Sequence, residues 1–220
     1  MRVGHFSKCF YGIDYNIGKE IAVKFALNNN KIINYNKEGT TLSKLTNNKF
    51  YPKLYNFHHN NNKEYLSKNI MGPDLSKITN FVDKKFLTRK TIRNIGISLI
   101  EILEFIHYNH IVHRDIKPSN MVWGVYENNT ILNKDTIYLI DFGESCYVGK
   151  LFFDEEEENF GRRGTTMFMS INAHLSKRPC PTDDIESMFY LCFILYYIHQ
   201  RKDFLGKNWN LRRLTKKIKL

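Results

Sequence analysis

The chain has 220 residues, of which 42% are hydrophobic and 14% aromatic, and this composition indicates a globular protein rather than a disordered one. It holds 33 lysine and arginine residues against 22 acidic residues, a formal net charge of +11, which indicates either a weak nucleic-acid contact through a basic surface or ordinary surface lysine. The most apolar run, residues 188–198, is too short to cross a bilayer, so no transmembrane segment is expected.

Residues 1–68 alternate short strand-like segments with one helix. The expected elements are strands at 9–13, 20–27 and 65–69 and a helix near 34–45. Lys24 carries the only charge in the apolar segment IAVKF, and such a lysine either snorkels to a strand end or binds phosphate groups. Glu38, in the predicted helix, could pair with Lys24 and fix its position. Gly39 weakens that helix by about 1 kcal/mol relative to alanine.

Helical periodicity follows the strand-like segments. Residues 69–73 are interpreted as a hinge between an N-terminal part, 1–68, and a C-terminal part, 74–220. A cleft between two such parts is the usual place for a ligand. A helix within 91–111 is predicted from apolar residues that recur on one face, namely Ile95, Leu99, Ile102, Leu103 and Ile106. A second long helix is expected from Asp183 onward.

The segment HRDIKPSN, residues 113–120, carries the most informative side chains. It places a carboxylate (Asp115), an ammonium (Lys117) and a carboxamide (Asn120) at offsets zero, two and five. Phosphoryl transfer uses such a set, because an acceptor orients the attacking hydroxyl, a cation screens the moving phosphoryl group and an oxygen ligand holds a divalent metal. Apolar residues precede the segment and MVW follows it, which predicts a loop between a helix and a strand.

A second chemical signal is the segment YLIDFGES. Its apolar start predicts a short buried strand, and Asp141 follows where that strand ends. An Asp-Phe-Gly sequence alone also fits an ordinary turn. Together with the preceding loop, however, Asp141 and Asn120 form a pair of oxygen ligands on neighbouring strand ends that could hold a metal on phosphate groups.

These segments together resemble the eukaryotic protein kinases over nearly the whole chain. IAVKF is similar to the strand that carries the phosphate-binding lysine of that family, and HRDIKPSN and DFG are similar to its catalytic and metal-binding segments. GTTMFMSINAHL, residues 164–175, looks like the corresponding segment of casein kinase I and the vaccinia-related kinases. MGPDL, 71–75, and DDIES, 183–187, match the same group.

The resemblance implies a bilobal α+β protein-kinase-like fold, with a small β-rich N-lobe and a mainly helical C-lobe, shortened at both ends. It implies a serine/threonine protein kinase that uses ATP and Mg²⁺ and acts on protein substrates. Asp184 would anchor the backbone of the catalytic loop. The implied roles are catalysis for Asp115 and Lys117, nucleotide binding for Lys24, Glu38, Gly4, Asn120 and Asp141, and metal binding for Asn120 and Asp141.

Two departures from the family pattern keep other functions open. In the window of the glycine-rich loop, residues 2–9, only Gly4 remains, and Arg2 and Ser7 stand at the other glycine positions. A pseudokinase or interaction module with weakened ATP binding is therefore the alternative. A small-molecule phosphotransferase is a third reading, against which the SINAHL segment argues. Residues 181–182 replace the paired arginines that bind primed substrates in casein kinase I relatives, so substrate preference is not carried over.

The remaining features concern location. Four cysteines are scattered without metal-ligand spacing, which is typical of reduced thiols and predicts a cytoplasmic protein. Abundant asparagine and lysine suggest an AT-rich genome and, with the resemblance, a large DNA virus or a protist; a viral protein would act in the host cytoplasm. The C-terminal segment NLRRLTKKIKL, 210–220, is either a basic amphipathic tail for nucleic acid or membrane or the start of a further helix.

Overall fold

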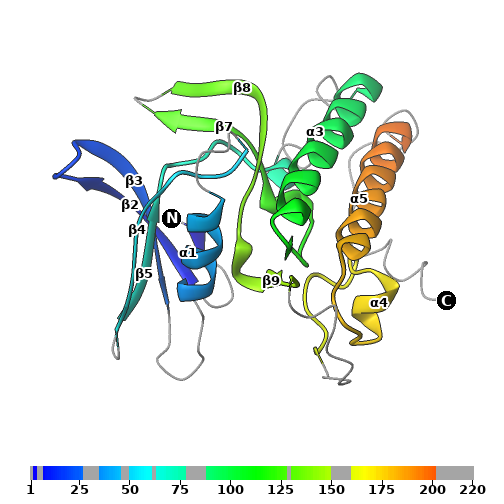
Figure 1. Ribbon diagram of the computed structural model, residues 1–220. Helices are drawn as coiled ribbons and strands as arrows, with labels where there is room; N and C mark the ends of the chain where they lie inside the picture. Colours follow the sequence, from blue (N-terminus) through cyan, green and yellow to red (C-terminus); the bar gives the residue numbers. More distant parts are fainter. Residues whose placement is uncertain are drawn as a thin grey trace.

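The computed structural model describes residues 2–3, 7–26, 35–45, 50–60, 63–77, 88–127, 130–149 and 160–201. A β-sheet with one helix forms one side of the molecule, two long helices lie on the other side, and a strand pair lies between them (Figure 1). The chain is mixed α+β, with strands in its N-terminal region and helices in its C-terminal part, as predicted. No helix among these residues is long and apolar enough to span a membrane.

An antiparallel sheet of five strands makes up the N-terminal region. Its strands are β1 (Arg2–Val3), β2 (Ser7–Asp14), β3 (Lys19–Ala26), β4 (Leu54–Asn60) and β5 (Lys63–Lys68). Their order across the sheet is β1-β2-β3-β5-β4, so β3 is the central strand. The strands predicted at 9–13, 20–27 and 65–69 correspond to β2, β3 and β5. The edge strand β4 is not among the predicted strands, since it contains few apolar residues. Its Asn56 and His58 side chains are exposed.

Helix α1 (Tyr35–Lys44) packs against β4 and confirms the helix predicted near residues 34–45. Its side chain Leu42 is buried in the core. Gly39 lies in the middle of the helix, where a Cβ atom would overlap the ring of Phe57 on β4. Glycine therefore lets the helix approach the strand closely, a requirement that helix propensity cannot reveal. This approach also fixes the position of Glu38, the preceding residue.

Two long antiparallel helices, α3 (Arg89–Tyr108) and α5 (Pro181–Arg201), form the helical side. The side chain of Thr88 caps the start of α3 by accepting a backbone hydrogen bond at 3.1 Å. Gly96 of α3 lies beside Cys192 of α5, so the two helices pack closely there. The buried residues of α3 include the five predicted ones, Ile95, Leu99, Ile102, Leu103 and Ile106.

Short elements connect the two sides. They are β6 (Ile111–Val112), η1 (Pro118–Asn120), β7 (Met121–Glu127), β8 (Thr130–Leu139), η2 (Phe142–Glu144), β9 (Cys146–Tyr147) and α4 (Ile171–His174). β6 pairs with β9, and β7 pairs with β8. The segment MGPDL crosses beside β7, where the Gly72 amide donates to the Gly124 carbonyl at 3.0 Å. A Cβ atom on Gly72 would overlap the Trp123 carbonyl, which explains the glycine of this segment.

We predict that Gly39→Ala destabilises the protein. Helix propensity alone would favour alanine by about 1 kcal/mol. The overlap with the Phe57 ring on β4 should cost about 1–3 kcal/mol, as overpacking does, and should outweigh that gain. Urea unfolding measures the difference, and Ser43→Ala, on the exposed surface of the same helix, serves as the control. A Gly39→Ala protein more stable than the parent would show that α1 can move away from β4 at no cost.

Candidate active site

A buried carboxylate of α5 holds the HRD loop, defined here as residues 113–120. Asp184 has no solvent exposure, and its two oxygens accept hydrogen bonds from the amides of His113 at 2.7 Å and Arg114 at 2.8 Å. Nε2 of His107, on α3, lies 3.0 Å from the same carboxylate. Arg114 has a φ of 68°, so the loop backbone turns sharply at this residue. The contacts agree with the anchoring role expected of Asp184.

The imidazole of His113 joins the HRD loop to the D-F-G segment, residues 141–143. Its ring meets the ring of Phe142 edge to face, with centroids 4.8 Å apart. Its Nε2 atom lies 3.3 Å from the carbonyl oxygen of Ile140. Both His113 and Phe142 are fully buried, so the two segments are packed as one unit. Their acidic residues are thereby held in a fixed relation to each other.

Asp115 lies at the centre of a polar cluster. Nζ of Lys117 is 2.6 Å from Oδ2 of Asp115, and the hydroxyl of Thr165 donates to Oδ1 at 2.9 Å. Lys117 also donates to the Thr165 oxygen at 2.9 Å. The Nδ2 group of Asn120 donates to the carbonyl of Asp115 at 2.8 Å and to its carboxylate at 3.0 Å. The structure therefore brings together three predicted residues and adds Thr165, to which the sequence pattern assigned no role.

Thr165 reaches this cluster because Gly164 lies against the HRD loop. Gly164 has a φ of +101°, and a Cβ atom there would overlap the carbonyl of Arg114. At the other end of the segment, Ser170 caps α4 and donates to Asp183 at 2.8 Å. The segment 164–170 is thus attached to the HRD loop at one end and to α5 at the other. Gly164 and Thr165 belong to the motif GTTMFMSINAHL, but the contact between these residues and the HRD loop cannot be inferred from the motif alone.

Lys24, on the central strand β3, makes two ion pairs. Its Nζ atom lies 2.7 Å from a carboxylate oxygen of Glu38 on α1 and 2.7 Å from one of Asp141. Burial by itself lowers the pKa of Lys24, but the two carboxylates outweigh it and raise that pKa above the ordinary value. Desolvation likewise opposes ionisation of Asp141, yet Lys24 holds the pKa of Asp141 well below its usual range. Both groups are therefore charged at neutral pH.

Glu38 has a second basic partner that the sequence did not single out. Its carboxylate is almost fully buried, and Nζ of Lys68 on β5 lies 3.5 Å from it. Leu66 pairs with Lys24 across the two strands, so Lys68 is the diagonal neighbour of Lys24 on the same face of the sheet. Two lysines thus compensate one buried carboxylate, as a charge in such a place requires. The predicted nucleotide contact of Gly4 lies outside the described residues.

The predicted metal ligands are neighbours in the structure. The amide of Ile140, next to Asp141, donates to the backbone carbonyl of Asn120 at 2.9 Å. Because Nδ2 of Asn120 is turned toward Asp115, its side-chain oxygen is left to serve as a ligand. The Asp141 side chain is 44% exposed, so a ligand can reach it. Among the described residues no three His, Cys, Asp or Glu side chains form a metal cluster.

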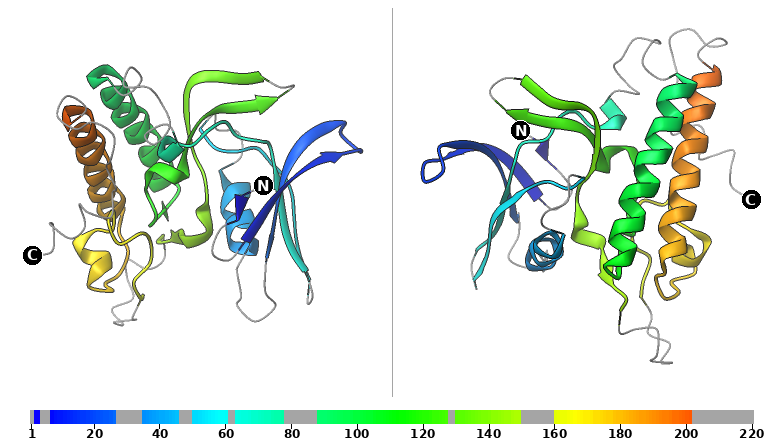
Figure 2. Two further views of the ribbon diagram at one scale, coloured as in Figure 1. Left: turned by 180° about the vertical axis from the view of Figure 1, so that it is seen from behind. Right: turned by 45° about the horizontal axis from the view of Figure 1, so that its top comes forward.

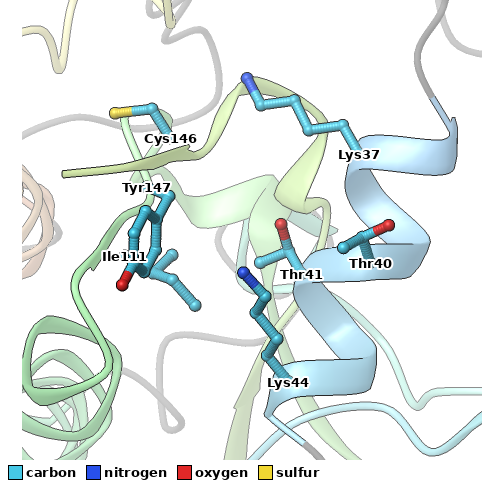
Figure 3. A pocket seen from close by; sticks show the side chains of 7 residues that line it. All are labelled: Lys37, Thr40, Thr41, Lys44, Ile111, Cys146 and Tyr147. Carbon is cyan, nitrogen blue, oxygen red and sulfur yellow. The ribbon is translucent and has the colours of Figure 1, made fainter. Parts of the chain in front are cut away.

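Helix α1 also borders a separate pocket of about 260 Å³ (Figure 3). Lys37 and Lys44 extend from α1 on one side of it, and Cys146 and Tyr147 of β9 lie on the other. Nζ of Lys44 lies 4.6 Å from the centre of the Tyr147 ring. None of the predicted site residues lines this pocket, so it is distinct from the polar clusters described above.

We predict that Asp184→Ala lowers the stability of the protein by about 3 kcal/mol, because two buried backbone amides lose their acceptor. Chemical denaturation followed by circular dichroism measures this loss. The matched control is Thr182→Ala, an exposed position at the start of the same helix, which should change stability little. Equal unfolding midpoints for Asp184→Ala and the parent would contradict the anchoring role.

Two comparisons with known proteins indicate the same family. The chain matches the family model described as Protein kinase domain over residues 3–201. It is similar to casein kinase I homolog 3 of Schizosaccharomyces pombe, with 27% identity over 202 residues. The match covers 89% of this chain and 44% of that relative, so the chain spans less than half of the relative's length. Lys24, the HRD loop, Asp141 and Asp184 all lie within the family match, and the chain therefore belongs to the protein kinase domain family.

Proposed function

We propose that this chain is a serine/threonine protein kinase that transfers the γ-phosphoryl group of ATP to hydroxyl groups of protein substrates. One observation carries the proposal: Lys24 contacts Asp141 at 2.7 Å across 117 residues of sequence, and His113 packs the D-F-G segment onto the loop that holds Asp115. These contacts join Lys24 and Asp141 to the loop of Asp115, which supports their assignment as phosphate-binding cation, metal ligand and hydroxyl acceptor.

Asp115 and Lys117 take the roles closest to the transferred group. Asp115 accepts a hydrogen bond from the substrate hydroxyl and positions it for attack. Hydrogen bonds from Thr165 and Asn120 hold its carboxylate in one orientation, so little reorganisation is needed when substrate binds. Lys117 screens the negative charge that the phosphoryl group carries between donor and acceptor. We assign Thr165 as a positioning residue, because it contacts both Asp115 and Lys117.

Lys24 and the metal ligands take the nucleotide. Lys24 stays protonated and binds the α- and β-phosphates, while Glu38 keeps its ammonium group in place. The oxygen of Asn120 and the carboxylate of Asp141 are the groups that would hold Mg²⁺, which neutralises phosphate charge when bound. Gly4 and the neighbouring amides would cover the phosphates. The nucleotide would lie between an N-lobe, 1–68, and a C-lobe, 74–220, joined at 69–73.

Several finer expectations rest on sequence alone. Specificity for serine and threonine is supported by Lys117 two residues after Asp115, and by the name of the fission yeast relative. A viral source, with a protist as the alternative, rests on the composition rich in asparagine and lysine together with the resemblance to casein kinase I relatives, and a cytoplasmic location rests on the scattered cysteines. A weak nucleic-acid contact rests on the net charge of +11. These stay predictions.

We predict that Asp141→Asn abolishes phosphate transfer while the protein stays folded. The change replaces a charged oxygen ligand by an amide of equal size and removes one ion pair of Lys24. Transfer of labelled phosphate to a test protein measures activity, and thermal unfolding measures the fold. Glu144→Gln makes the same chemical change on a partly exposed carboxylate three residues away and should keep activity. Full activity of a folded Asp141→Asn protein would refute the metal assignment.

We predict that Asp115→Ala retains near-normal Mg-ATP binding but lowers phosphorylation of serine and threonine about a hundredfold or more, as loss of a general base or its positional equivalent does. Calorimetry measures binding, and mass spectrometry of a mixed Ser/Thr/Tyr peptide pool measures transfer. Glu127→Ala, a carboxylate on β7 paired with Lys19, is the control. If the parent protein shows no transfer above Asp115→Ala at any metal or ATP concentration, the kinase proposal fails and a pseudokinase takes its place.

A further inference from the structure

The outer face of the five-stranded sheet carries a row of aromatic side chains. In Figures 1 and 2, α1 and the described helices of the C-terminal part lie on one side of this sheet. Lys24 and Phe57 lie against α1 and so belong to the inner face. Because side chains alternate along a strand, the residues that follow them belong to the outer face, and the strand register adds two more. The four are Phe10 of β2, Phe25 of β3, Tyr65 of β5 and His58 of β4, and they are called here the aromatic row.

The four rings contact one another in order across the sheet. The ring centroids of Phe10 and Phe25 lie 5.7 Å apart, and those of Phe25 and Tyr65 lie 6.1 Å apart. The rings of Tyr65 and His58 are stacked, with their centroids 5.6 Å apart. Nδ2 of Asn56 donates a hydrogen bond to the Tyr65 hydroxyl at 3.4 Å. Since neighbouring strands are about 4.8 Å apart, the row extends over about 14 Å, from β2 to β4.

The aromatic row is accessible to a ligand. Phe10 retains 39% of its accessible surface and Phe25 retains 38%, and His58 is exposed as well. Phenylalanine has no polar atom that could bond to water, so two neighbouring exposed rings are unfavourable in contact with water alone. A contiguous exposed apolar surface marks an interaction site more often than scattered single side chains do. The row is therefore a candidate docking surface.

The charges around the aromatic row favour a polyanion as its ligand. Two lysine positions border the row on the outer face: Lys8, opposite Phe25 in the strand register, and Lys63 on β5. The other charged residues at outer-face positions of β2–β5 are Asp14 and Lys19, which lie opposite each other at the far end of β2 and β3. The balance is positive, in agreement with the net charge of +11. Lysine is depleted at protein–protein interfaces, whereas surfaces that bind single-stranded nucleic acid combine basic residues with aromatic rings.

We propose that the aromatic row binds single-stranded RNA or DNA by stacking bases on Phe10, Phe25 and Tyr65. An open sheet face with aromatic side chains can stack two or three bases, and a row of about 14 Å suits a ligand of that size. The ligand is single-stranded because the bases of a duplex are stacked on one another and present no free ring face. The positive balance of the face attracts the phosphate groups between the bases. The nucleic-acid contact expected from the net charge thereby has a definite location, which does not depend on kinase activity.

The test is fluorescence anisotropy of labelled oligo-U and oligo-dT of about 12 nucleotides, titrated with the full chain in the absence of ATP. We expect both single strands to bind, and the ratio of their affinities distinguishes RNA from DNA as the preferred ligand. Phe25→Leu and Tyr65→Leu keep an apolar side chain but remove the ring, so each should weaken binding at least about fivefold. Tyr15→Leu is the matched control, because Tyr15 is an aromatic residue outside the row, 91% exposed in the β2–β3 turn. It should leave binding unchanged.

A second measurement needs no variant. Ultraviolet cross-linking of the parent protein to the same oligonucleotides, followed by mass spectrometry, should identify cross-links within β2, β3 or β5. Thermal unfolding of Phe25→Leu and Tyr65→Leu shows whether each variant is folded. If either variant fails to fold, the cross-linked positions of the parent protein decide the question.

Four results would overturn the proposal. The first is a parent protein that binds neither oligonucleotide even at a low salt concentration of about 50 mM. The second is undiminished binding by folded Phe25→Leu and Tyr65→Leu proteins, or cross-links confined to other elements, either of which would place the nucleic acid elsewhere. The third is a duplex of the same length that binds as tightly as the single strands, because phosphate attraction without stacking would then suffice. The fourth is a dimer in analytical ultracentrifugation that Phe25→Leu dissociates, without oligonucleotide binding, which would assign the row to a second copy.

Discussion

The carboxylate of Asp184 is completely buried, and a buried carboxylate without partners would be very costly. The amides of His113 and Arg114 and the ring of His107 supply the required partners. The same contacts give the HRD loop a backbone that it could not keep alone, since Arg114 occupies the left-handed region. The geometry around Asp115 therefore depends on the packing of α5 against α3, which fixes where Asp184 lies.

The second half of the candidate site depends on the sheet. Lys24 is placed by the central strand β3, and its carboxylate partners come from α1 and from the D-F-G segment. The position of α1 on the sheet depends in turn on the contact of Gly39 with Phe57. A charged network with one buried carboxylate tolerates little displacement, because an unpaired charge there would be strongly unfavourable. The packing of α1 on the sheet therefore determines whether the charges in the site can pair.

The two faces of the helix pair α3–α5 differ in their exposure to solvent. Its inner face holds the apolar core, and the N-terminal end of α5 supplies Asp184 to the HRD loop. Its outer face keeps aromatic side chains such as Phe189 and Phe193 accessible.

The sequence by itself determined the family resemblance, the α+β class and the apolar face of α3, because these depend on local motifs and on helical period. It also identified Lys24, Glu38, Asp115, Asn120 and Asp141 as candidates. Only the tertiary structure revealed the edge strand β4, which contains few apolar residues, and the contacts of Thr165 and Lys68. These two residues contact partners that are 50 and 30 residues away in the sequence, and a motif with fixed spacing cannot describe such contacts. The same reason applies to Gly39, because glycine is required there by the nearby ring of Phe57 and not by the helix that contains it.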